Sequence, residues 1–181
     1  MQKQACVNTQ TCNDGISRIQ INEPNTYNAL SFNTLNLLLK SFEKFNNDDI
    51  TKVIIIEGLG RGFSGGHNLK EIRSLKKKSE YKKLFNMCSK LMLEIVEGRK
   101  PVIAKVHGAA FAAGCQLVAS CDLAISSDDA IFATPGVNIG LFCSTPMVAV
   151  SRKVSRKKTM KMLITGDPID AKYAKEIGLI N

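Results

Sequence analysis

The chain has 181 residues, of which 44% are hydrophobic and 23% charged, and this composition excludes a wholly disordered protein. Its 25 basic and 16 acidic side chains give a net charge of +9, which favours polyanionic ligands. No apolar run is long enough to cross a bilayer, and the polar N-terminus does not resemble a secretion signal. We therefore expect an intracellular protein of the cytoplasm or the mitochondrial matrix, with no membrane span.

The N-terminal part of the sequence predicts a flexible segment followed by the first elements of a domain. Residues 1–14 are polar and are expected to be flexible, so that the core domain spans residues 15–181. Apolar and polar residues alternate over Ile16–Ile21, as in a half-buried strand. Ser31 is expected to cap an amphipathic helix that ends near Phe45.

Two glycine-rich loops each follow a short apolar strand. The sequence VIIIE at 53–57 leads into GLGRGFSGGHNLKEI at 58–72, where a helix is expected to begin near Asn68. A strand at 102–106 leads into a turn of small residues and then a helix that starts near Gly114. Small residues allow close approach to the backbone, and free N–H groups at a helix start can hold an oxyanion. The two loops could each contribute one N–H to the same oxygen.

The rest of the chain continues the alternation of strands and helices. Charged helices are expected up to residue 97, and further elements are expected at five places: strands at Leu123–Ser126 and 130–133, and helices at 148–154, Arg156–Thr165 and 171–177. Gly178 ends the last helix. The recurring strand–strand–helix order predicts one α/β domain.

These motifs resemble, in the same order, those of the crotonase superfamily, also called the enoyl-CoA hydratase/isomerase family. GFSGGHNLKEI at 62–72 and HGAAFAAGCQLVASCD at 107–122 resemble the two oxyanion-hole motifs. The family's active-site strand and loop resemble residues 132–140, FATPGVNIG. A later family segment resembles residues 165–181, TGDPIDAKYAKEIGLIN. The resemblance implies a ClpP/crotonase spiral of β-β-α units, with a C-terminal helical region that is apparently shortened.

The resemblance also implies a ligand and a site. It predicts an acyl-CoA thioester whose carbonyl oxygen is held by the backbone N–H groups of His67 and Gly114, in fatty-acid or acyl-CoA metabolism of the lyase or isomerase type. No metal is expected, and no cofactor apart from the coenzyme A of the substrate. A homotrimer or a dimer of trimers is expected. Further residues are placed at the substrate: Gly66, Asn68, Leu69, Lys70, Ala113, Pro135 and Asn138.

The chain departs from the family at both glutamates that hydratases use to activate and deliver water. Gln116 and Gly136 occupy these two positions. An amide cannot act as a general base, and glycine has no side chain, whereas each such group contributes about a hundred- to ten-thousand-fold to the rate. Ordinary hydration is therefore not expected. The alternative is a non-catalytic pseudoenzyme, or a regulatory protein that binds acyl-CoA or a partner.

Three further readings of individual residues remain open. The lysine-rich stretches at 70–90 and 152–161 suit solvated helix faces, the phosphates of coenzyme A or, as a third alternative, RNA. Few aromatic residues lie among these lysines, which argues against RNA. The six cysteines lack Cys-x-x-Cys spacing and predict reduced, mostly buried thiols, with Cys143 the one candidate for an active-site neighbour. The imidazole of His67 is expected to pack or to act in catalysis, and packing is favoured.

Overall fold

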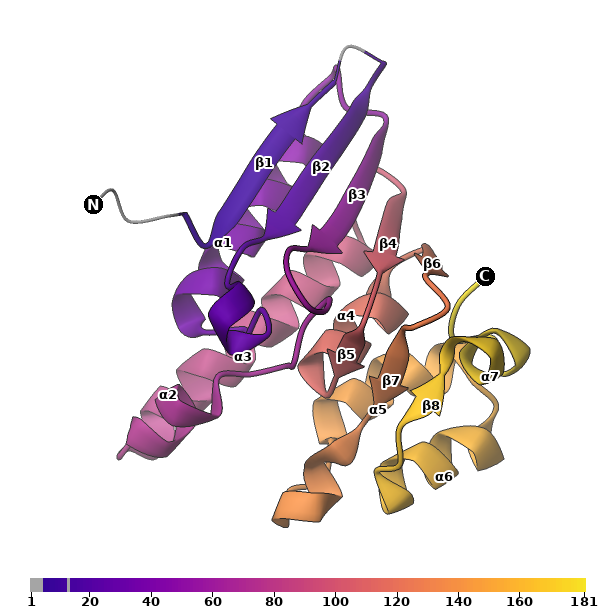
Figure 1. The fold of residues 1–181 in the computed structure, drawn as a ribbon. Helices are drawn as coiled ribbons and strands as arrows, with labels where there is room; N and C mark the ends of the chain where they lie inside the picture. The colour runs from indigo at the N-terminus through magenta and orange to yellow at the C-terminus, as the bar shows by residue number, and fades with distance from the viewer. Residues whose placement is uncertain (1–4, 13) are drawn as a thin grey trace.

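The computed structural model describes residues 5–12 and 14–181, and its described part contains two sheets with helices packed around them (Figure 1). The larger sheet has the strand order β1-β2-β3-β4-β6: β1 (Val7–Thr11), β2 (Ile16–Ile21), β3 (Val53–Gly58), β4 (Val102–Val106) and β6 (Leu123–Ser126). The smaller sheet has the order β5-β7-β8: β5 (Ala109–Phe111), β7 (Ile131–Ala133) and β8 (Ile169–Asp170). Strands β2, β3, β4 and β6 run parallel, so their carboxyl ends lie at one edge.

The helices follow the strands in the alternating order that the sequence predicts. Their bounds are α1 (Phe32–Asn46), α2 (Leu69–Ser74), α3 (Lys78–Val96), α4 (Ala113–Ser120), α5 (Ser144–Lys153), α6 (Arg156–Thr165) and α7 (Ala171–Glu176). Two short 3-10 helices are η1 (Pro24–Thr26) and η2 (Pro135–Ile139). Helix α1 packs against α3, and both lie behind the larger sheet in Figure 1.

The main core lies between the larger sheet and helices α1 and α3. Helix α1 contributes Leu35, Leu38 and Phe42, which are fully buried and lie on one face of the helix. Ile54 and Ile56 of β3, also fully buried, extend the same core. The Oγ of Ser31 accepts a hydrogen bond from the backbone N–H of Thr34 at 3.1 Å, so Ser31 caps α1 as the sequence predicts.

The structure matches the predicted bounds of several elements and corrects the expectation for the N-terminus. Strand β2, strand β6 and helix α6 lie at the predicted residues. The expected flexible segment 1–14 is wrong for residues 7–11, because these residues form β1 and pair antiparallel with β2. Residues 1–4 and 13 of that segment lie outside the described residues. The ordered domain therefore begins before residue 15.

Strand β5 lies within the segment of small residues for which the sequence predicts only a turn. Its side chains Ala109, Ala110 and Phe111 carry no strand pattern of their own. Its conformation comes from its neighbours, because it pairs in parallel with β7 and forms a bridge to Ser64. This pairing fixes the second glycine-rich loop against the first.

Replacement of Phe42 by alanine tests the core of α1. Phe42 is fully buried, so Phe42→Ala is expected to lower the free energy of unfolding by about 3–5 kcal/mol, measured by urea denaturation. The matched control is Ile50→Ala, because Ile50 is 61% exposed and its loss should change stability by less than about 0.5 kcal/mol. Equal effects of the two changes would contradict this placement of the core.

Candidate active site

The two glycine-rich loops lie side by side and are joined by backbone hydrogen bonds. The N–H of Phe63 donates to the carbonyl of His107 at 2.9 Å, and the N–H of Ser64 donates to that of Ala109 at 3.0 Å. In return, the N–H of Phe111 donates to the carbonyl of Ser64 at 2.9 Å. The loops thus behave as short paired strands, which hold their positions against each other more firmly than two free loops would.

Two glycines let the loops approach each other closely. A Cβ atom on Gly114 would lie 2.3 Å from the carbonyl oxygen of Ser64, which is too close for any side chain. Gly66 has a φ of +88°, and a Cβ there would lie 2.8 Å from the carbonyl oxygen of Phe111 and 3.1 Å from the backbone nitrogen of Ala113. The structure therefore brings together the predicted residues Gly66, Ala113 and Gly114.

Both loops carry backbone N–H groups near this contact. Leu30 forms a parallel bridge with His67 through two backbone hydrogen bonds on either side of His67. The N–H of Leu30 donates to the Gly66 carbonyl at 2.8 Å, and the N–H of Asn68 donates to the Leu30 carbonyl at 3.4 Å. In such a parallel bridge the N–H of His67 itself points away from Leu30. Ala113 and Gly114 are the first two residues of α4, where an N–H has no intrahelical acceptor. Such groups can stabilise a negatively charged oxygen.

The side chain of His67 packs against helix α3. Its ring lies edge-on to that of Phe85, with 5.3 Å between ring centroids and 70° between planes. Its Nε2 atom is buried, and the described residues offer it no hydrogen-bond partner. Burial lowers the pKa of His67 to about 4, so the ring is neutral at physiological pH. These contacts agree with the favoured packing role.

Gln116 lies one turn into α4, and its side chain lines a pocket. Only 5% of Gln116 is exposed, and its Oε1 atom has no hydrogen-bond partner among the described residues. The pocket has a volume of about 360 Å³ and lies between α3, α4 and α5. A buried amide oxygen without a partner lowers stability by about 1–3 kcal/mol unless a ligand or water donates to it.

Gly136 lies in η2, where the backbone leaves no room for a side chain. The N–H of Leu141 donates to the Gly136 carbonyl at 2.9 Å, which folds the segment back on itself. A Cβ on Gly136 would lie 2.1 Å from the carbonyl oxygen of Leu141 and 2.8 Å from the Sγ of Cys143. The Cys143 thiol is buried, and burial raises its pKa, which disfavours a nucleophilic thiolate.

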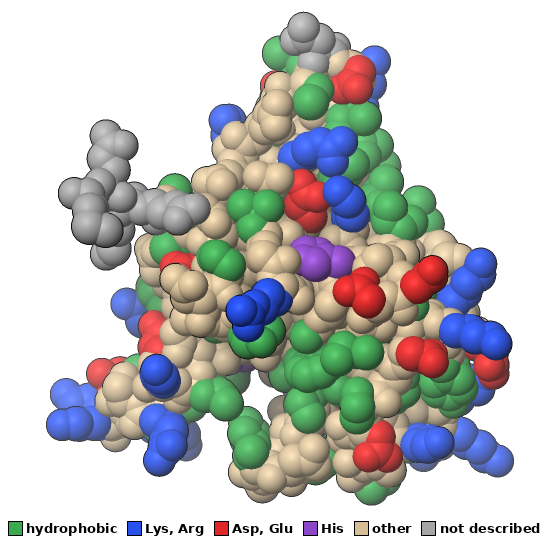
Figure 2. All heavy atoms as spheres, viewed as in Figure 1, with side chains coloured by type: hydrophobic (Ala, Val, Ile, Leu, Met, Phe, Trp, Pro, Cys, Tyr) green, Lys and Arg blue, Asp and Glu red, His purple; other side chains and the backbone are tan. Residues whose placement is uncertain are grey.

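The remaining predicted residues lie around these loops in different settings. Asn68 caps α2, because its Oδ1 accepts from the N–H groups of Lys70 (3.1 Å) and Glu71 (3.2 Å). Leu69 and Lys70 are exposed on α2. Pro135 and the exposed Asn138 lie in η2, on the far side of a hollow that Figure 2 shows at the lower margin, between α2 and the segment containing η2.

The N–H of Ala113 is a candidate donor that the sequence analysis does not name. Ala113 is predicted there only as a substrate-binding residue, whereas its backbone nitrogen lies beside Gly66, which directly precedes His67. The sequence contains a signal for this candidate, because Ala113 precedes Gly114 at the start of the helix that follows the turn of small residues. The N–H groups of Ala113 and Gly114 are thus two candidates for the second donor to the thioester carbonyl oxygen.

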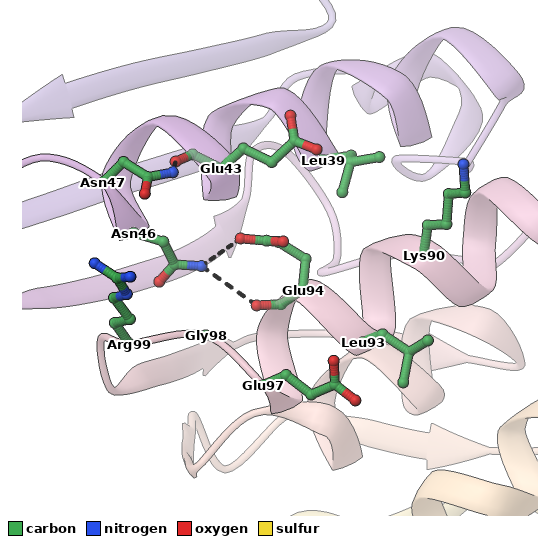
Figure 3. A pocket seen from close by; sticks show the side chains of 10 residues that line it. All are labelled: Leu39, Glu43, Asn46, Asn47, Lys90, Leu93, Glu94, Glu97, Gly98 and Arg99. Carbon is green, nitrogen blue, oxygen red and sulfur yellow. Dashed lines mark hydrogen bonds between the residues drawn. The ribbon is translucent and has the colours of Figure 1, made fainter.

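A separate pocket between α1 and α3 has a structural explanation (Figure 3). Asn46 points from α1 toward Glu94 of α3, and its Nδ2 donates to the Glu94 carbonyl at 3.3 Å and to Oε1 at 2.6 Å. None of the predicted site residues lines this pocket. We therefore assign Asn46 to the contact between the two helices.

The described residues contain no group of three or more His, Cys, Asp or Glu side chains that could hold a metal ion. Within the same part of the chain, no helix is long and apolar enough to cross a membrane. The candidate site comprises backbone N–H groups of the two loops, the amide of Gln116 and the adjoining pocket.

Comparison with known proteins identifies the class to which this fold and site belong. Residues 11–181 match the family model described as enoyl-CoA hydratase/isomerase. The chain therefore belongs to the enoyl-CoA hydratase/isomerase family, and its fold is the crotonase fold that the sequence motifs predict.

Three similar proteins illustrate the relationship. The chain is 50% identical over 167 residues to enoyl-CoA hydratase domain-containing protein 3, mitochondrial, of Xenopus laevis, which covers 92% of this chain and 57% of that protein. It matches the crystal structure of human enoyl Coenzyme A hydratase domain-containing protein 3 with a TM-score of 0.94 and 45% identity, covering 98% of this chain and 70% of that one. An enoyl-CoA hydratase of Mycobacterium smegmatis gives a TM-score of 0.96 and 43% identity, covering 98% and 69%. The chain thus spans little more than half the length of its curated relatives.

The low pKa of His67 predicts how its imidazole titrates. Because its folded-state pKa of about 4 lies below the usual 6.5, the unfolded chain takes up this proton first as the pH falls. The stability contributed by neutral His67 is fully present above pH 6.5 and is lost as the pH falls toward 4. Proton NMR titration should show one imidazole titrating near pH 4, and a His107→Asn variant assigns it. A His67 signal that titrates near pH 6.5 would contradict the burial described here.

Proposed function

We propose that the chain binds an acyl-CoA thioester, and that the thioester carbonyl oxygen accepts hydrogen bonds from His67 N–H and from an N–H at the start of α4. The observation that carries this proposal is the contact of Gly114 with Ser64, which places both loops at one point. Two N–H donors polarise the carbonyl and would stabilise the negative charge that develops on its oxygen during reaction. Membership of the enoyl-CoA hydratase/isomerase family supports the choice of ligand.

The second donor in this proposal is the N–H of Gly114 or that of Ala113. Both lie in the first turn of α4 and lack an intrahelical acceptor. The position of the Ala113 nitrogen beside Gly66 favours Ala113, because Gly66 directly precedes the first donor. The helix dipole adds a partial positive charge at this end, which supports an oxyanion next to either group.

The reaction in this proposal is not hydration by two glutamates. Gln116 offers an amide that neither takes up nor releases a proton at neutral pH, and Gly136 has no side chain and no space for one. Thioester chemistry that needs only a polarised carbonyl remains open to this site. The same two replacements support the second candidate function, a non-catalytic protein that binds acyl-CoA to regulate lipid metabolism.

Coenzyme A carries several phosphate charges, and exposed lysines on α2 and α3 suit them. Lys70, Lys82 and Lys83 are exposed on these two helices, close to the first loop in the sequence. We also propose a trimer or a dimer of trimers, and a location in the cytoplasm or the mitochondrial matrix. The word mitochondrial in the names of the relatives supports the matrix.

Replacement of Gly114 by alanine tests the contact of the two loops. The new Cβ would meet the Ser64 carbonyl at 2.3 Å, so Gly114→Ala should separate the loops and weaken acyl-CoA binding at least about tenfold in calorimetry. The matched control is Gly65→Ala, which lies on the first of the two loops. A Cβ on Gly65 would lie 3.5 Å from its nearest neighbour, an ordinary contact, and binding should persist. Normal binding by Gly114→Ala would refute the proposal.

The two glutamate positions should respond differently when glutamate is introduced. Gln116→Glu keeps the size of the side chain and adds a base, so it should raise the hydration rate of crotonyl-CoA at least about tenfold above the background. Gly136→Glu must displace the Leu141 carbonyl and should lower the melting temperature without a gain in hydration. For both variants, loss of the enoyl absorbance measures the hydration rate, and thermal unfolding measures the melting temperature. Hydration by the unaltered chain at the rate of Gln116→Glu would contradict this account.

A further inference from the structure

The pocket beside Gln116 is a groove whose lining is partly apolar. Residues of α3, α4 and α5, together with Asp122 after α4, line it. Its apolar lining consists of Met92, Leu93, Val96, Ala119, Val148 and Ala149. Several of these side chains, such as Leu93 (49%) and Val96 (50%), are strongly exposed, so the groove presents apolar surface to an incoming chain.

The groove has a defined direction, because α4 and α5 run side by side with the same orientation. At their starts, Cys115 of α4 lies near Cys143, which directly precedes α5. Burial raises the pKa of Cys115 to about 12, and the nearby Cys143 adds to this effect. At their ends, Asp122 and Lys153 line both this groove and a second small pocket. One end of the groove therefore lies at Gln116, next to the proposed carbonyl site, and the other at Asp122, Arg152 and Lys153.

Polar groups lie at both ends of the groove. At the inner end, the buried Oε1 of Gln116 has no hydrogen-bond partner among the described residues. At the outer end, Arg152 and Lys153 form no ion pair with any described residue. Asp122 is the one acidic side chain that lines the groove, and its Oδ2 already accepts a hydrogen bond from the N–H of Val102 at 2.8 Å.

We propose that this groove receives the acyl chain of a thioester whose far end carries a carboxylate, that is, the coenzyme A monothioester of a medium-length dicarboxylic acid. The inference rests on the proposed function and names its substrate class. The carboxylate would lie between the Arg152 guanidinium and the Lys153 ammonium, for which two positive charges outweigh the single Asp122. A chain ending in a methyl group would leave these charges without a partner.

The length of the groove indicates the length of the chain. Its lining residues on α5 run from Thr145 to Lys153, and those on α3 run from Ser89 to Val96. Seven to eight residues of helix span roughly 10–12 Å, which accommodates an extended acyl chain of about eight carbon atoms. Suberyl-CoA, with eight carbons and a terminal carboxylate, is therefore the test ligand.

The experiment compares the calorimetric affinities of suberyl-CoA and octanoyl-CoA for the full chain. The two ligands share coenzyme A and chain length, so the contacts made by the coenzyme A part cancel in the ratio of the two affinities. We expect suberyl-CoA to bind about fivefold more tightly at low salt, with the ratio falling as salt is added. The methyl ester of suberyl-CoA, which lacks the charge, should bind like octanoyl-CoA.

Three variants assign the preference to the outer end of the groove. The double change Arg152→Gln, Lys153→Gln should bring the affinity ratio to about one, and Asp122→Asn should increase it. The matched control is Arg156→Gln, Lys157→Gln, which removes the same charges from α6, outside the groove, and should preserve the ratio. Circular dichroism confirms that each variant is folded.

The outcomes separate this inference from the proposed function. Binding of both thioesters with equal affinity, or a ratio that the groove and control variants change alike, would overturn the inference and leave acyl-CoA binding intact. Failure of both thioesters to bind would overturn the proposed function, and the inference with it. A preference for suberyl-CoA that only the groove variants abolish would support both.

Discussion

The backbone of Gly114 lies against the Ser64 carbonyl at a distance that admits no side chain, and the candidate site depends on this contact. It brings the start of α4 to the first glycine-rich loop, while the hydrogen bonds between Ser64, Ala109 and Phe111 keep the two loops in register. In the proposed site, the N–H group of His67 and one at the start of α4 would donate to the same oxygen. Because these groups belong to the backbone, their arrangement depends on loop geometry more than on the side chains of their residues.

Gln116 and Gly136, the two positions at which the resemblance to hydratases predicts glutamates, have different surroundings. Gln116 keeps a side chain of the same length, buried in α4 and lining the groove, so the position can still contact a ligand. At Gly136 the Leu141 carbonyl occupies the space of a Cβ atom. The Gln116 side chain can therefore contact a ligand, whereas any side chain at residue 136 would require η2 to change its conformation.

Most elements could be predicted from the sequence because their patterns are local. The alternation in β2, the cap at Ser31 and the glycine after α7 each act over a few residues. Strands β1 and β5 could not be found in this way, since their conformation comes from pairing with β2 and β7. The loop contact followed from the family motifs. The closed space at Gly136 and the groove with two cations at its end arise from residues distant in the sequence, so they required the structure.

Ala112 immediately precedes α4 and has a φ of 49°, a region that non-glycine residues rarely occupy. Its N–H donates to the Ala133 carbonyl at 2.9 Å, which helps to hold this unfavourable conformation in place. Glycine would occupy it without strain, but it would also give the start of α4 more freedom in the unbound protein. Ala112 therefore carries some backbone strain but restricts the conformations of the unbound chain at the start of α4, which also limits the orientations of the N–H groups that follow it.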